Sequence, residues 1–217
     1  MRPRRGPMLL TYGILLVFLF IALAPFVGNL FTSLKTRQEL SSGLFTLPEN
    51  WRWENYSNAW EGANFGDFFI NSVVVVVPVV VISLVLSLLS GYAFGTISFP
   101  GQGILLLVIT LGLMAPLEAV IIPLWNLMEQ LGLRNSKWAL ILPQIALSFS
   151  FGTFWMRSHF KGMPRDLIDA AVVDGCNTSP LSTRNVLWRI LLPLSGPAVL
   201  SLIVLVFMWT WNEFFLV

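Results

Sequence analysis

The sequence has 217 residues, of which 56% are apolar and 11% are charged, with a mean hydropathy of +0.76. Water-soluble domains are about 45–50% apolar and about 25% charged, so this composition excludes an ordinary soluble globule and favours a membrane protein. A net charge of +2 is not the basic face of a nucleic-acid-binding protein, and one cysteine with one histidine excludes an intrachain disulfide and a Cys/His zinc site.

Five segments are apolar and long enough to cross a bilayer, which takes about 20 helical residues. They are residues 8–30, 69–97, 104–128, 138–156, and a part of 190–212 that starts after Pro193 or Pro197. The second and third are separated by the Pro-Gly turn at 98–103. We therefore predict an all-α integral membrane protein with five visible spans.

The first span has a competing interpretation as a signal peptide, because three arginines precede its apolar run. The run is longer than a signal peptide needs, and 22–25 is a poor cleavage site, so a retained anchor is favoured. In the second span, Gly91-x-x-x-Gly95 offers a face on which another helix can approach closely.

The lysines and arginines in the connections predict the orientation. Three lie before the first span and five lie between 157 and 189, whereas the opposite side has five spread over two connections. This predicts a multi-pass protein with a cytoplasmic N-terminus, a cytoplasmic loop at 157–196 and an extracytoplasmic loop at 35–67. The chain ends at 217 without a polar flank after the fifth span, so we expect a sixth helix beyond a C-terminally incomplete single domain.

The cytoplasmic loop is predicted to begin with a short helix at 163–175. Pro164 suits the first helical position, and Gly175 suits the position just after the helix. Leu167, Ile168, Ala171 and Val172 form one apolar stripe. Because a helix of two to three turns is unstable alone in water, it must pack on this chain, on lipid or in a partner's groove.

The residues of this loop resemble a known motif. Asp169-Ala170-Ala171-x-x-Asp174-Gly175, followed by Ile190-x-Leu192-Pro193, is similar to the EAA loop of binding-protein-dependent ABC importers. Shorter matches, such as Gly91-Tyr92-Ala93 and Trp211-Asn212-Glu213, extend the resemblance to the carbohydrate-uptake branch over essentially the whole chain.

The resemblance implies a six-span fold, of which five spans are visible, with a cytoplasmic EAA coupling helix between spans four and five. It also implies a second permease subunit as partner, an extracytoplasmic solute-binding protein, and a separate ATP-binding cassette ATPase that holds ATP and magnesium. The residues carried over to ATPase coupling are Asp169, Ala170, Ala171, Asp174, Gly175, Ile190, Leu192 and Pro193. The implied function is import of a sugar, an oligosaccharide or a related solute through the inner membrane.

Two features depart from the family pattern. Asp169 stands where the motif has Glu, and the distance from Gly175 to Pro193 is five residues longer than usual, with a polar stretch at 177–183. The longer loop either extends harmlessly or weakens coupling, so an inserted but inactive permease is an alternative.

Polar and aromatic residues in the spans are candidates for the transport path, because ionisable side chains inside a membrane are costly. The candidates are Glu118, Trp125, Asn212 and Glu213. No G-x-x-x-x-G-K-[ST] loop occurs, so this chain is not expected to bind a cofactor or to hydrolyse ATP. An integral-membrane enzyme is a remote alternative, since Asp166, Asp169 and Asp174 do not share one helix face.

Overall fold

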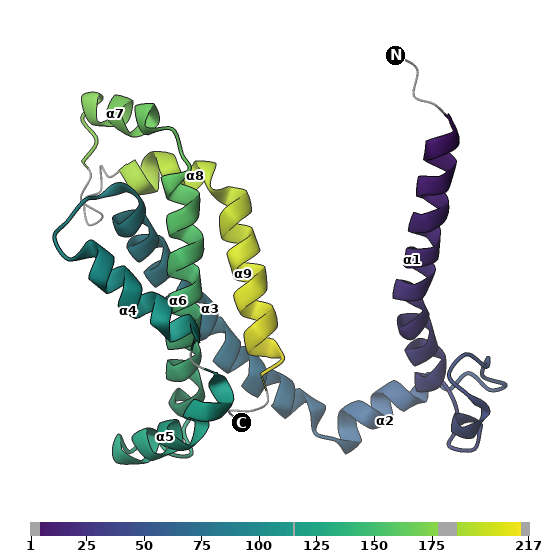
Figure 1. The fold of residues 1–217 in the computed structure, drawn as a ribbon. Coiled ribbons are helices and arrows are strands. Elements are labelled where there is room, and N and C mark those ends of the chain that lie inside the picture. Colours follow the sequence, from purple (N-terminus) through teal and green to yellow (C-terminus); the bar gives the residue numbers. More distant parts are fainter. Residues whose placement is uncertain (1–4, 115, 178–185, 214–217) are drawn as a thin grey trace. The chain divides into compact units, whose positions relative to one another are not determined.

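The computed structural model describes residues 5–114, 116–177 and 186–213. The chain divides into two compact units, residues 1–69 and 70–217, which are described separately. Every regular element in the described ranges is a helix, as the composition predicted (Figure 1).

The first unit begins with a single long membrane helix, α1 (Arg5–Ser33). Within residues 10–33, the most apolar stretch of 18 residues has a mean hydropathy of 2.5, and only 6% of it is buried in the structure. A helix that is apolar on all sides and unburied suits a lipid environment. The predicted first span is therefore present as one uninterrupted helix.

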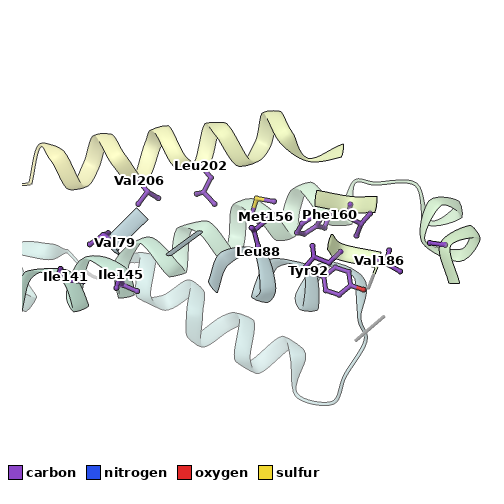
Figure 2. Packing of buried hydrophobic residues seen from close by; sticks show 13 residues of the cluster. Val79, Leu88, Tyr92, Ile141, Ile145, Met156, Phe160, Val186, Leu202 and Val206 are labelled. Atoms are coloured by element: carbon purple, nitrogen blue, oxygen red, sulfur yellow. The ribbon is translucent and has the colours of Figure 1, made fainter. Parts of the chain in front are cut away.

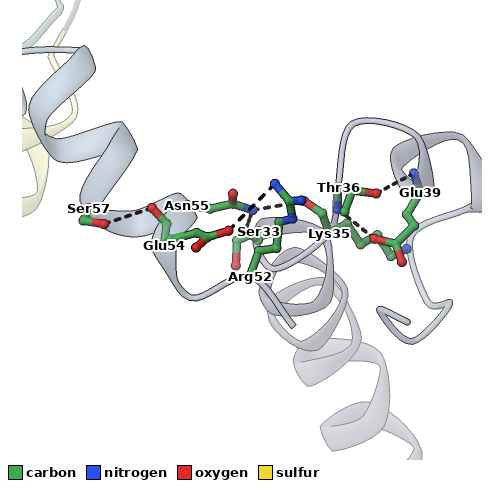
Figure 3. A network of polar contacts seen from close by, with 8 residues as sticks. All are labelled: Ser33, Lys35, Thr36, Glu39, Arg52, Glu54, Asn55 and Ser57. Atoms are coloured by element: carbon green, nitrogen blue, oxygen red, sulfur yellow. Dashed lines mark hydrogen bonds and ion pairs between the residues drawn. The ribbon is translucent and has the colours of Figure 1, made fainter. Parts of the chain in front are cut away.

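Two short helices, η1 (Glu39–Ser42) and α2 (Glu54–Gly62), follow in the predicted extracytoplasmic loop. Lys35 is only 3% exposed, and its Nζ donates to the Gly43 carbonyl and to the Thr46 hydroxyl. Asn55 Nδ2 donates to the carbonyl oxygens of Ser33 and Lys35, each at 3.0 Å (Figure 3). These bonds compensate for burying the ammonium group and fix the loop against the end of α1.

Glu39 organises the start of the same loop. The Thr36 amide donates to Glu39 Oε2 at 2.7 Å, and the Glu49 amide donates to Oε1 at 2.9 Å. Hydrogen bonding, first of all from the Thr36 amide, holds the pKa of the Glu39 carboxyl below its ordinary value of 4.5. Two backbone donors that are far apart in the sequence thus share this carboxylate.

The remaining elements form the second unit, apart from the start of α3. In chain order they are α3 (Phe65–Thr96), α4 (Gln102–Met114), α5 (Leu117–Gln130), α6 (Trp138–Lys161), α7 (Arg165–Val173), the π-helical η2 (Leu187–Leu191), α8 (Leu192–Leu194) and α9 (Gly196–Trp211). By length and composition α1, α3 and α6 can each cross a membrane, and up to five spans result if each bent helix pair is one span.

The predicted span at 104–128 is present as two helices, α4 and α5. The helix breaks between Met114 and Leu117, and its two arms are bent by 107°. Pro116 is extended, with φ −67° and ψ 129°, and proline has no amide hydrogen with which to continue the hydrogen bonding of the preceding helix. For the fifth span, α9 begins at Gly196, after the first of the two predicted starting points, Pro193, and before the second, Pro197.

The core of the second unit forms where α3, α6 and α9 pack together, with η2 at one end. Tyr92 of α3 meets Phe160 of α6 edge to face at 6.2 Å, and Leu202 and Val206 of α9 complete the layer (Figure 2). A Cβ added at Gly91 would lie 2.5 Å from Met156 Cβ, and one at Gly95 would lie 3.1 Å from Phe160 Cβ. The predicted close-approach face is thus confirmed, and its partner is α6.

Candidate functional site

Helix α7 lies where the sequence predicted the helix of the EAA-like loop. It runs from Arg165 to Val173, so Pro164 precedes the first turn by one residue and does not occupy it. Gly175 has φ +85°, a left-handed geometry that glycine adopts without strain. The chain therefore turns directly after the helix and returns toward the core.

The two faces of α7 differ. Ala171 is 1% exposed and belongs to the core cluster, and Ile168 packs against the same cluster. Leu167 and Val172 are exposed. The buried part of the predicted apolar stripe is therefore narrower than expected, because α7 contacts the core only through Ile168 and Ala171 among these four residues. The outer face carries Val173, at 87% exposure, together with the exposed residues Asp169, Ala170 and Asp174.

The segment that contains the second half of the motif packs in the same core cluster as Ala171 of α7. Leu187 and Leu191 of η2 are fully buried in the core cluster, while Ile190 and Leu192 are half-buried against it and Pro193 is exposed. The Val186 amide donates to the Asn177 carbonyl at 3.1 Å, which closes the loop. Most of the polar stretch at 177–183 lies outside the described residues.

The junction of α8 and α9 is held by α6. The arms 187–194 and 196–211 are bent by 76° at Ser195, where Pro197 lacks the amide that would continue the helix. Ser195 Oγ donates to the Leu191 carbonyl at 2.6 Å and lies 3.0 Å from His159 Nε2. One helical turn earlier, Trp155 Nε1 donates to the Ala198 carbonyl at 3.0 Å.

A second feature of the unit is a pocket of about 270 Å³ bordered by α4, α6 and α9, and both α4 and α9 contact α6. Its lining residues are Gly112, Leu113, Gln144, Leu147, Ser148, Phe151, Trp209, Thr210 and Glu213. The lining combines aromatic rings with amide, hydroxyl and carboxylate groups, which is the usual composition of a small-molecule site.

Of the three predicted path residues whose side chains the structure describes, only Glu213 lines this pocket. Trp125 is exposed, and the Arg134 guanidinium lies 4.9 Å from its ring centre. Asn212 is exposed and donates to the Met208 carbonyl at 2.7 Å. Glu118 is in the first turn of α5, but its side chain lies outside the described residues.

Sequence reasoning missed the polar residues of α6 and α9 in the pocket. Gln144, Ser148 and Phe151 recur at i, i+4 and i+7, which puts them on one face of α6. That periodicity inside a charge-free span could have identified them. The described residues contain no group of three His, Cys, Asp or Glu side chains that could hold a metal ion.

Comparison with known proteins identifies the family. Residues 87–217 match the family described as binding-protein-dependent transport system inner membrane component. The chain belongs to this family. It is therefore a permease subunit of the ABC transporter type, and such subunits are membrane proteins that are not enzymes.

Individual relatives agree with this assignment. The chain is 32% identical over 207 residues to the diacetylchitobiose uptake system permease protein NgcG of Streptomyces coelicolor, covering 95% of this chain and 67% of the relative. It is 32% identical over 210 residues to the arabinooligosaccharides transport system permease protein AraQ of Halalkalibacterium halodurans, covering 95% and 72%. The chain thus spans about two thirds of the length of these curated relatives.

A solved structure shows the same fold. It belongs to a bacterial ABC transporter involved in the import of the acidic polysaccharide alginate, with a TM-score of 0.78 and 24% sequence identity. The match covers 99% of this chain and 74% of the other.

Proposed function

We propose that this chain forms part of the translocation path of an ABC importer for a sugar, an oligosaccharide or a related solute, and that α7 couples it to a separate ATPase. The observation that carries the coupling proposal is the placement of α7. Ala171 anchors the helix on the core through one ridge, which leaves Asp169, Ala170 and Asp174 exposed for a partner. The apolar side chains Leu167, Val172 and Val173 are exposed as well, and helix-in-groove recognition uses such apolar contacts.

The support under α7 can transmit movement to the membrane helices. Ala171 contacts the buried cluster that contains Leu187 and Leu191 of η2, and η2 leads through α8 to the bend at Ser195. A displacement of α7 by a closing ATPase would therefore reach α9 through a short, packed route. Ile190, Leu192 and Pro193 lie on this route, and Gly175 allows the turn that connects it to α7.

The proposed assembly contains a second permease subunit, an extracytoplasmic solute-binding protein and ATPase subunits that bind ATP and magnesium. The chain would lie in the inner membrane with a cytoplasmic N-terminus, so that loop 157–196 faces the ATPase and loop 35–67 faces the binding protein. Carbohydrate permeases such as NgcG and AraQ among the relatives support this class of solute.

For the path itself we propose Glu213, which lines the pocket of the second unit, and with it Glu118, Trp125 and Asn212. Glu213 has the strongest support, because its side chain borders the pocket and ionisable residues within membrane domains mark substrate pathways.

Two substitutions on the α7 loop test the coupling proposal. Asp169→Lys reverses an exposed charge, and Gly175→Asp adds a charged side chain at a left-handed position where no neighbour lies within 4 Å. Both are expected to abolish co-purification of the ATPase from membranes while the chain still inserts. Removing such a charge-dependent contact from an interface costs about 2–5 kcal/mol.

Matched controls separate recruitment from general damage. Gly101→Asp places the same side chain at another glycine with φ +81° and open surroundings, and Glu61→Lys reverses an exposed acid of α2. Both controls should retain the ATPase. Retention of the ATPase by both Asp169→Lys and Gly175→Asp would show that α7 is not the coupling helix.

A further inference from the structure

We infer that the pocket between α4, α6 and α9 is a binding subsite for uncharged glycosides, in which Gln144 supplies the central hydrogen-bonding group. The inference deepens the proposed import function and rests on it. It assigns to this chain a solute contact built from Gln144, Ser148, Thr210 and Glu213 together with the rings of Phe151 and Trp209.

Gln144 provides the first argument. Its side chain lines the pocket, the residue is only 7% exposed, and its Oε1 is buried without a hydrogen-bond partner among the described residues. An unpaired buried amide oxygen is costly, and the great majority of such atoms are paired in folded proteins. A ligand hydroxyl that donates to Oε1 would supply the hydrogen bond that this amide oxygen lacks.

The surroundings of Gln144 give the second argument. Ser148 lies one turn further along α6, and Thr210 faces the same pocket from α9. Other positions of α9, including Leu200 and Val204, are apolar and exposed, as expected for contact with lipid. Ser148 and Thr210 thus lie on the pocket side, where water or a solute can satisfy their hydroxyl groups.

Aromatic side chains complete the site. Phe151 and Trp209 form an edge-to-face pair with ring centres 4.8 Å apart, and both rings border the pocket. A sugar ring presents apolar C–H faces and hydroxyls at its edge, so it needs an aromatic surface beside amide and hydroxyl groups. The volume of about 270 Å³ is close to the lower end of ligand pockets, which suits a small glycoside unit.

The charge of the lining restricts the ligand class. Glu213 is the one ionisable residue among the described lining residues, which include no lysine or arginine. A uronate or sulfonate in the pocket would face this carboxylate and no lysine or arginine among the described lining residues, and like charges repel strongly away from bulk water. The site therefore favours neutral or N-acetylated sugars over acidic ones.

Cysteine labelling tests whether the pocket is wet and whether it binds sugar. The chain has a single cysteine, so Cys176→Ser gives a background without thiols. On that background, Ser148→Cys in the assembled transporter should react with a charged, water-soluble thiol reagent, whereas Val204→Cys on the exposed apolar side of α9 should not. Diacetylchitobiose or maltotriose should slow the labelling of Ser148→Cys, and digalacturonate should do so only at higher concentration. An unlabelled Ser148→Cys, or equal protection by the three sugars, would overturn the inference.

Transport by the complete complex gives an independent readout. Gln144→Leu and Thr210→Val should each lower uptake of the protecting sugar by roughly tenfold, as expected when a site loses a hydrogen bond worth about 1.4 kcal/mol. The controls Gln130→Leu at the exposed end of α5 and Thr110→Val, whose hydroxyl donates to the Leu106 carbonyl, should leave uptake unchanged. Glu213→Gln should reduce the discrimination against digalacturonate.

The outcomes distinguish the subsite from the proposed function. A wild-type complex that retains its ATPase and imports sugar, while Gln144→Leu transports normally, refutes the subsite alone. A wild-type chain that neither retains an ATPase nor imports sugar refutes the import function and the subsite with it.

Discussion

The hydrogen-bonded pair of His159 on α6 and Ser195 fixes the bend between α8 and α9, which lies on the proposed coupling route. Because the single hydroxyl proton of Ser195 is donated to the Leu191 carbonyl, Ser195 Oγ acts as acceptor and His159 Nε2 carries the hydrogen. Trp155 adds a bond to the Ala198 carbonyl one turn away. The last two turns of α6 therefore contact the bend and the first turn of α9.

We expect Ser195→Ala to loosen this bend. The substitution removes the acceptor of His159 and one bond within the α8 turn, so it should lower the stability of the purified chain by about 1–2 kcal/mol. Ser201→Ala is the control, because that exposed hydroxyl donates only to the Pro197 carbonyl of its own helix. Thermal unfolding in detergent measures both variants, and equal midpoints would show that the His159 contact contributes nothing.

The residues involved also show what the sequence could predict. His159 stands near Arg157 and Lys161, and this neighbourhood predicts an interfacial cation rather than a partner of Ser195, which lies 36 positions away. By contrast, the left-handed geometry of Gly175 follows from its place after a short helix. Local conformation is thus predictable from neighbouring residues, whereas side-chain pairs between helices depend on how those helices pack.

Among the elements, the pairing of α3 with α6 depends on small residues at the contact. Gly91 lies against Met156 and the backbone of Arg157, and Gly152 of α6 lies against Ser87 of α3. Close approach of this kind replaces the hydrophobic driving force that is missing between helices inside lipid. The glycine positions therefore set the distance between the two longest helices of the second unit.

Gly91→Ala is expected to destabilise this pair. The added Cβ would lie 2.5 Å from Met156 Cβ and 2.9 Å from the Arg157 nitrogen, and backbone atoms cannot move aside cheaply. Overpacking of this kind costs about 1–3 kcal/mol. Gly13→Ala on α1 is the control, because a Cβ added there would have no neighbouring atom within 4 Å. The measurement is the thermal unfolding midpoint of both variants in detergent. A midpoint for Gly91→Ala as high as that of the control would mean that the helices separate more easily than the contact distances indicate.

On the scale of the whole molecule, the helices differ in how they can cross the membrane. Three helices are long enough by themselves, and the pairs α4–α5 and α8–α9 are bent. If each bent pair counts as one span, the five crossings place loop 35–67 and loop 157–196 on opposite sides. The charge distribution then predicts that loop 157–196 is cytoplasmic.

Labelling of intact cells tests this orientation. On the Cys176→Ser background, Ser57→Cys on α2 should react with a membrane-impermeant thiol reagent from outside, whereas Ser158→Cys near the end of α6 should react only after permeabilisation. Both positions are exposed, so access to the reagent depends on the side of the membrane. The reverse pattern would invert the orientation and remove α7 from reach of a cytoplasmic ATPase.

The sequence by itself determined the membrane class, the position of most helices and the turn at Gly175, because apolar run length and proline or glycine chemistry act over a few residues. Only the tertiary structure decided that the 104–128 segment breaks at Pro116, that Ala171 faces inward, and that Gln144 and Thr210 share a pocket. In a span that is apolar on all sides, hydrophobicity does not distinguish the lipid face from the packed face. The rotation and register of each helix are set by contacts with its neighbours, and these are not readable from local periodicity.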